Sequence, residues 1–176
     1  MASAILEALT EEPKLFPHVC CGMSSRLLET LAARLPRTPS LVLSVGSGSG
    51  LLEELLHLQT NGSINIYGVE VPSCRSVYLP EDRTLRVPST TSVHADAILA
   101  ETLIFCYPRE PSLIAKYVDE FGSGALAQIV LIVNHNDWNG LSDILHDCFS
   151  TVELVDSAGL PGYEVLVVAS APRGRH

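Results

Sequence analysis

Residues 41–56 read LVLSVGSGSGLLEELL, an apolar run that meets three alternating glycines and continues as a leucine-rich acidic segment. The apolar run predicts a strand, and the leucine spacing after the glycines predicts a helix. Gly46, Gly48 and Gly50 therefore lie in the turn between the two. A tight turn needs only one glycine, so three of them favour a loop whose bare backbone approaches a ligand at the helix N-terminus.

Strand and helix patterns alternate along the rest of the chain. Periodicity predicts helices over residues 4–9, 23–35, 51–58, 112–121 and 141–149. Strands are predicted over residues 40–45, 64–71, 101–107, 127–133, 151–157 and 163–171. The last two strands are separated by only about five residues, too few for a crossover helix, so they are expected to form an antiparallel hairpin. The prediction is a doubly wound, Rossmann-like α/β fold with a mostly parallel sheet of seven or slightly fewer strands.

The chain is expected to form a single domain over residues 1–176. Residues 1–39 are expected to be a helical N-terminal segment, and residues 40–171 the Rossmann-like core. The segment 72–100 is short for a strand, a helix and a further strand. One helix beside the sheet is therefore expected to be reduced or absent.

The composition disfavours several classes of protein. Hydrophobic residues make up 47% of the chain and charged residues 18%, which argues against disorder. The net charge is −9 and the 11 Lys and Arg residues are scattered, which disfavours a nucleic-acid partner. No apolar run approaches the roughly 18 residues that suggest a membrane span, and the N-terminus lacks the basic start of a signal peptide. A soluble cytoplasmic protein is therefore expected.

Five cysteines are present, and none forms a CxxC pair, so reduced thiols are expected. Cys20 and Cys21 lie close to His18, which raises the question of a metal site. Adjacent cysteines rarely give two ligands to one ion, and no second ligand pair follows at zinc-like spacing. The sequence therefore predicts no metal, and it leaves the roles of Cys20 and Cys21 open.

The glycine spacing distinguishes between the known nucleotide-binding loops. A dinucleotide-binding GxGxxG would place its third glycine at position 51, which is Leu51, and the Gly-Lys-Ser/Thr of a P-loop is absent. GxGxG instead resembles motif I of the class I S-adenosylmethionine-dependent methyltransferases. The resemblance extends over residues 24–171 and includes the terminal hairpin. It implies S-adenosylmethionine as the cofactor, and methyl transfer to a small-molecule or protein acceptor.

The resemblance also implies which residues hold the cofactor. Glu70 ends a predicted strand, 24 residues after Gly46, where the family has an acidic residue for the ribose hydroxyls. Asp96 stands where the family contacts the adenine amino group, although an aspartate there also suits the N-cap of a short helix. The implied cofactor-binding residues are Ser44, Gly46, Ser47, Gly48, Gly50, Glu70, Val71, Asp96 and Ala97.

Two positions depart from the family pattern. Ser44 stands where motif I usually has Asp or Glu, and a serine brings no charge. The segment FCYPR (105–109) lacks the Asp/Asn-Pro-Pro-aromatic sequence of many amino-group methyltransferases, so that chemistry is not supported. Tyr107 is still a candidate catalytic residue, because its ring can stack against a planar substrate or cofactor.

His135 is the candidate general base for an oxygen or sulfur acceptor. It lies in the polar segment NHNDWN (134–139), which follows a predicted buried strand at the edge where open α/β sheets bind ligands. The alternative is a polar turn that leads into the helix from Leu141, and His94 is the second-choice base. The acceptor pocket is expected to combine this loop, the loop 106–112, and four N-terminal residues, His18, Cys20, Cys21 and Met23.

Two rival functions stay open. The first is a catalytically degenerate methyltransferase-fold protein that acts as a binding or scaffold module, which Ser44 and the altered 105–109 segment favour. The second is a nucleotide-binding or dinucleotide-binding Rossmann protein, which the glycine spacing and the terminal hairpin disfavour. The oligomeric state is left open.

Overall fold

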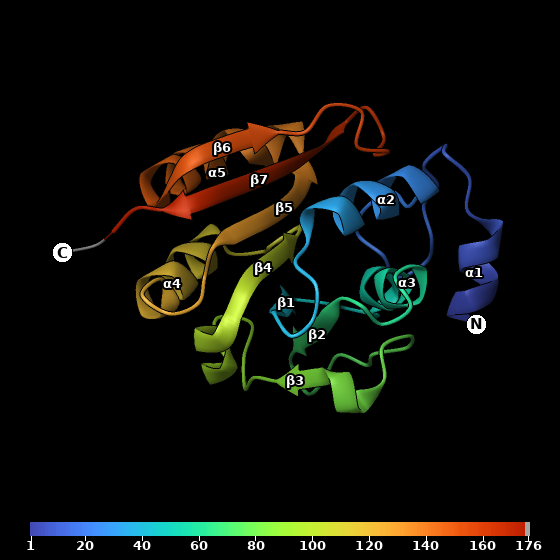
Figure 1. The fold of residues 1–176 in the computed structure, drawn as a ribbon, viewed down its shortest axis with the longest axis horizontal. Helices are drawn as coiled ribbons and strands as arrows, with labels where there is room; N and C mark the ends of the chain where they lie inside the picture. The colour runs from blue at the N-terminus through green and yellow to red at the C-terminus, as the bar shows by residue number, and fades with distance from the viewer. Residues whose placement is uncertain (175–176) are drawn as a thin grey trace.

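A computed structural model describes residues 1–174 and shows a twisted sheet between two layers of helices (Figure 1). The strands are β1 (Leu41–Val45), β2 (Asn65–Glu70), β3 (Thr84–Arg86), β4 (Ala100–Cys106), β5 (Gln128–Asn134), β6 (Phe149–Leu154) and β7 (Glu164–Pro172). The α-helices are α1 (Ala2–Ala8), α2 (Ser25–Arg34), α3 (Leu51–Gln59), α4 (Pro111–Phe121) and α5 (His135–Cys148). Two short 3₁₀ helices are η1 (Glu81–Arg83) and η2 (Ala95–Leu99).

The seven strands form one sheet in the order β3-β2-β1-β4-β5-β7-β6. Strands β1 to β5 pair in parallel with one another. Strand β7 lies between β5 and β6 and is antiparallel to both. This arrangement confirms the predicted doubly wound fold and its terminal hairpin. The strand order reverses at β1, because β2 and β3 lie on one side of β1 and the later strands lie on the other. Open α/β sheets bind ligands at such a point of reversal.

Both faces of β5 are buried, which explains its continuous apolar run. Ile129 and Leu131 pack into one core cluster, with apolar residues of α4 and α5. Val130 and Ile132 pack into the other, with leucines of α2 and α3. Alternate residues of a strand point to opposite faces, so a strand covered by helices on both sides must be apolar throughout.

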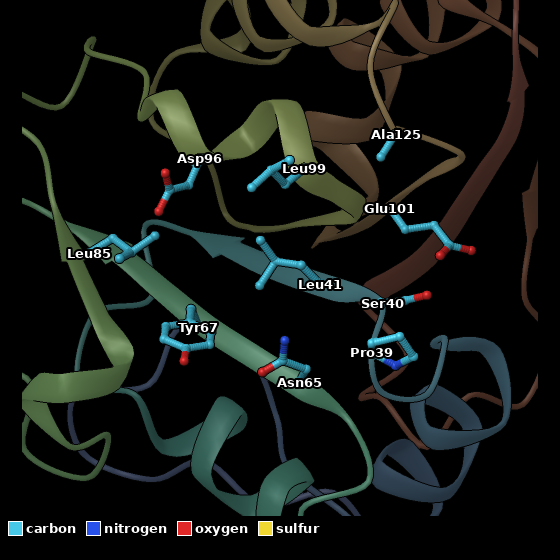
Figure 2. A pocket seen from close by; sticks show the side chains of 10 residues that line it. All are labelled: Pro39, Ser40, Leu41, Asn65, Tyr67, Leu85, Asp96, Leu99, Glu101 and Ala125. Carbon is cyan, nitrogen blue, oxygen red and sulfur yellow. The ribbon is translucent and has the colours of Figure 1, made fainter.

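The expected missing helix is confirmed, because only η1 joins β2 to β3 and only η2 precedes β4. The sheet beside η2 has a hollow of about 590 Å³ where a longer helix would pack (Figure 2). Leu41, Tyr67 and Leu85 lie in this hollow, and Asp96 and Leu99 reach it from η2. It is lined largely by residues at the starts of β1, β2 and β4, away from the glycine loop.

The predicted polar loop 134–139 is wrong, since α5 begins at His135, six residues before the expected start at Leu141. Asn134 caps the helix, and its Oδ1 accepts a hydrogen bond from the Asp137 amide at 2.8 Å. Trp138 is buried on the same helix face as Leu141, and this packing extends the helix through a segment whose composition suggests a turn.

The N-cap suggested for Asp96 is also wrong. His94 caps η2 instead, and its Nδ1 accepts a hydrogen bond from the Asp96 amide at 3.1 Å. Ser24 caps α2, and its hydroxyl accepts a hydrogen bond from the Leu27 amide at 3.0 Å. No helix within residues 1–174 is long and apolar enough to cross a membrane.

Candidate functional site

A cavity of about 380 Å³ opens at the carboxyl ends of β1, β2 and β4. This volume is in the range of small-molecule sites, and the position is where open α/β sheets bind ligands. Its lining comes from these three strand ends, the loops that follow β1, β2, β3 and β4, the start of α4 and one N-terminal residue. These residues are Cys20, Val45, Gly46, Gly48, Val69, Glu70, Val71, Ser73, Cys74, Val87, Ser89, Thr90, Ser92, Phe105, Cys106, Tyr107, Pro108, Arg109, Glu110 and Leu113.

The three glycines of the loop have two different functions. All three have positive φ angles, 75° at Gly46, 58° at Gly48 and 78° at Gly50, which favour glycine. A Cβ atom on Gly46 or Gly48 would meet no atom within 4 Å, and both residues line the cavity. A Cβ atom on Gly50 would lie 2.3 Å from the Cβ of Leu79. The first two glycines therefore expose backbone to the cavity, whereas the third allows close packing.

Glu70 fixes the glycine loop to the end of β2. Its Oε2 accepts a hydrogen bond from the Gly48 amide at 2.9 Å, and its Oε1 accepts one from the Val71 amide at 2.9 Å. Each carboxylate oxygen has two acceptor positions, so both retain capacity for a further donor. The Glu70 carboxylate thus holds the loop in place and also faces the cavity as an acceptor.

Ser44 and Glu53 form a buried pair behind the glycine loop. The Ser44 hydroxyl donates to Oε1 of Glu53 at 2.6 Å, and the two residues are only 1% and 2% exposed. Burial raises the pKa of Glu53 to about 7, although the hydrogen bond from Ser44 opposes the change. The sequence analysis missed Glu53. Its only sequence signal is a glutamate next to Leu51 and Leu52 in the first turn after the loop.

Tyr107, the candidate catalytic residue, follows the end of β4 and lines the cavity. Its φ of 52° is in the left-handed region, which is uncommon for a tyrosine. The Tyr107 hydroxyl donates a hydrogen bond to Oε2 of Glu164. Burial raises the pKa of Tyr107, and the bond to Glu164 raises it further. The hydroxyl therefore stays protonated and acts as a hydrogen-bond donor at neutral pH.

The N-terminal segment contributes only in part to the cavity. Cys20 lines it, whereas Cys21 and Met23 are fully buried and His18 lies at a smaller hollow behind the glycine loop. Burial raises the pKa of Cys20, and an interaction with the Cys21 thiol raises that of Cys106. These thiols are therefore protonated at neutral pH, and none is a ready nucleophile.

Six predicted site residues do not line this cavity, namely Ser44, Ser47, Gly50, Asp96, Ala97 and His135. His135 is exposed in the first turn of α5, where its amide donates to the Tyr163 carbonyl at 3.0 Å. Asp96 lines the other hollow together with Leu41, Tyr67 and Leu85 (Figure 2), and Ala97 is buried in the core. Hydroxyl groups that the sequence analysis passed over line the cavity instead, at Ser89, Thr90 and Ser92.

Solved structures of other proteins share this arrangement of strands. Protein Atu636 from Agrobacterium tumefaciens, a predicted O-methyltransferase, matches with a TM-score of 0.59 and 16% identity over 87% of this chain and 82% of its own. Streptococcus pneumoniae Sp1610, in complex with S-adenosyl-L-methionine, matches with a TM-score of 0.56 and 20% identity over 88% of this chain and 76% of its own. Human N-acetylserotonin methyltransferase, in complex with SAM, matches with a TM-score of 0.56 and 11% identity over 83% of this chain and 50% of its own.

The chain spans about half of the length of two matched structures, 55% of the S-adenosylmethionine-dependent methyltransferase SibL and 50% of human N-acetylserotonin methyltransferase. No protein-family model and no curated protein sequence matches the chain. At these identities the likeness defines the fold. The chain has the fold of the class I S-adenosylmethionine-dependent methyltransferases, with the sheet order, the antiparallel β7 and the glycine loop after β1.

Proposed function

We propose that the chain binds S-adenosylmethionine in the cavity at the ends of β1, β2 and β4, and transfers its methyl group to a small-molecule or protein acceptor. The observation that carries this proposal is the glycine loop, in which Gly46 and Gly48 present bare backbone to the cavity beside the Glu70 carboxylate. The SAM complexes among the matched structures support the choice of ligand.

The residues that line the cavity fit this ligand. The free acceptor positions of Glu70 suit the two hydroxyls of a ribose. Val71, Val87 and Leu113 provide apolar walls for a purine ring. Ser89 and Thr90 offer hydroxyls for its polar edge, a role that the resemblance gave to Asp96. The glycine loop is then the part of the cavity that contacts the methionine part of S-adenosylmethionine.

Bound S-adenosylmethionine supplies a methyl group that is already electrophilic. The work left to the protein is to orient the acceptor and to exclude water. Tyr107 is the candidate residue for orienting the acceptor, since it lines the cavity and its ring can stack against a planar molecule. A base role for His135 stays a prediction, and loss of methyl transfer in His135→Ala with unchanged cofactor affinity would support it.

A binding module without turnover is the second candidate function. It is favoured by the hydrogen bond between Tyr107 and Glu164, which already occupies the polar group at the end of β4. Binding of S-adenosylmethionine without methyl transfer to any of a panel of thiol, hydroxyl, amine and carboxylate acceptors would favour this candidate.

The decisive experiment is a calorimetric titration of the wild type, Glu70→Gln and Glu7→Gln with S-adenosylmethionine and S-adenosylhomocysteine. Glu7 is exposed on α1, so its substitution is a matched control. Losing one charged acceptor is expected to weaken binding by about 10- to 100-fold in Glu70→Gln, and Glu7→Gln should behave as wild type. No binding by the folded wild type would overturn the proposal.

A further inference from the structure

Glu53 is a buried carboxylate that lacks a second partner. Its Oε1 accepts the hydrogen bond from Ser44, while Oε2 has no hydrogen-bond partner and is shielded from solvent. Within residues 1–174 no lysine, arginine or histidine lies within ion-pair distance of Glu53, and the nearby Arg83 pairs with Glu54. A buried carboxylate in this state is costly unless a cation or a further donor reaches it.

Glu53 lines a small hollow behind the glycine loop. Its volume is about 40 Å³, and its lining includes Glu53, Ser47, Cys20 and Cys106. The Ser47 hydroxyl is also buried without a partner. Cys20, Gly46, Gly48 and Cys106 line both this hollow and the larger cavity, so the two adjoin.

The size and polarity of the hollow restrict its occupant. The hollow has about a tenth of the volume of the larger cavity, so it suits a small polar group rather than a whole nucleoside. An aliphatic ammonium is such a group, and it carries three donors with no acceptor. Oε2 of Glu53 and the hydroxyl of Ser47 are two acceptors without partners.

We infer that Glu53 binds the ammonium group of the ligand's methionine part, with Ser47 as a second acceptor. This inference rests on the proposed function, because it takes the ligand to be S-adenosylmethionine or its product. Ser44 then has a positioning role, since its hydrogen bond holds the carboxylate toward the hollow.

Binding of a cation beside Glu53 is expected to change the protonation of its carboxylate. The groups around the Glu53 carboxylate are the hydroxyl of Ser44, the carboxylate of Glu70 and the thiols of Cys20 and Cys106. The hydroxyl and the protonated thiols carry no charge, and Glu70 favours the protonated form of Glu53. Burial raises the pKa of Glu53 to about 7, so part of the Glu53 side chains is protonated near neutral pH, and an incoming ammonium favours the ionised form. Binding should therefore release protons to the buffer.

The test compares Glu53→Gln with wild type and with Glu7→Gln. Each protein is titrated with S-adenosylhomocysteine and with methylthioadenosine, which lacks the amino and carboxyl groups. Loss of the carboxylate should weaken the affinity for S-adenosylhomocysteine by about 10- to 100-fold. The affinity for methylthioadenosine should change by less than about threefold. Calorimetry at pH 7 in phosphate and in Tris should show proton release by wild type and Glu7→Gln, and none by Glu53→Gln.

The outcomes separate the two proposals. If wild type binds both ligands and Glu53→Gln binds S-adenosylhomocysteine equally well, a water fills the hollow and the inference on Glu53 is overturned alone. Equal weakening of both ligands would also overturn it, because the effect would then be structural. If the folded wild type binds neither ligand, the proposed function fails and the inference fails with it. Thermal unfolding of each variant verifies that it is folded.

Discussion

The backbone amide of Gly22 donates a hydrogen bond of 2.8 Å to Oε1 of Glu164, across 142 positions of sequence. The other carboxylate oxygen of Glu164 accepts from the Tyr107 hydroxyl. A single buried side chain at the start of β7 therefore joins the N-terminal segment to the end of β4, next to the cavity. This three-way contact fixes the position of Tyr107 and of the segment that carries Cys20.

Replacing Glu164 with Gln should destabilise the fold. One of its two acceptor oxygens becomes an NH₂ group, which cannot accept from either Gly22 or Tyr107. A lost buried hydrogen bond to a charged acceptor predicts a fall in the free energy of unfolding of about 1.5–3 kcal/mol, measured by urea denaturation. Glu153→Gln is the matched control, because Glu153 pairs with Arg34 at the surface, and equal stabilities of the two variants would contradict the prediction.

Two glycine substitutions should have opposite effects on stability. In Gly50→Ala the new Cβ would meet Leu79 at 2.3 Å at a positive φ, so we expect a loss of about 2 kcal/mol or more. In Gly140→Ala the new Cβ would meet nothing within 4 Å inside α5, so a gain of about 0.5–1 kcal/mol is expected. Chemical denaturation of both variants checks the pair, and a stabilised Gly50→Ala would refute the packing described for the loop.

Gly48→Ala should affect binding more than folding. The added methyl group would extend into open space at the cavity, and the positive φ costs a non-glycine residue about 1–2 kcal/mol. We expect the variant to fold with slightly lower stability and to lose S-adenosylhomocysteine affinity by about 10-fold or more. Gly162→Ala is the control, because its Cβ would also meet nothing and Gly162 does not line the cavity. Unchanged affinity in Gly48→Ala would argue against a ligand over the loop.

The burial of Glu53 predicts a pH-dependent difference between wild type and Glu53→Gln. The pKa of Glu53 is about 7 in the folded chain and 4.5 ordinarily, so the folded state binds the proton more tightly than the unfolded state. Between these values the stability of wild type falls as pH rises, and above about pH 7 the loss is complete. Glu53→Gln escapes this loss, so its stability relative to wild type should rise by about 3 kcal/mol between pH 4 and pH 8. Denaturation curves across this range test it, and a constant difference would contradict it.

Much of the fold followed from local sequence patterns. The alternation of apolar strands with amphipathic helices predicted the sheet, and the short link before Tyr163 predicted the hairpin. The prediction for the polar segment after β5 was wrong, because its Asn and Asp residues are typical of a turn by composition. In the structure Asn134 caps α5, and Asp137 lies in the first turn of that helix. Local composition does not distinguish these cases, whereas the burial of Trp138 against the sheet does.

Some residues of the candidate site were also predicted from the sequence, whereas others were not. Gly46, Gly48 and Glu70 were identified because a loop after one strand and the end of its neighbour must meet at one edge of a parallel sheet. Glu53 was missed because a glutamate on an exposed helix and a glutamate beneath a loop look the same in sequence. Its burial depends on how α3 packs against β1, through the contact with Ser44.

The sequence by itself determined the class of fold, the position of the glycine loop and the sheet edge at which the candidate site lies. These follow from periodicity, from glycine conformation and from the geometry of parallel strands, which are all local rules. Only the tertiary structure decided that Glu53 faces the loop from behind, that Glu164 joins Gly22 to Tyr107, and that His135 and Asp96 lie away from the cavity. Such contacts depend on side-chain packing between elements distant in sequence, which residue types alone do not specify.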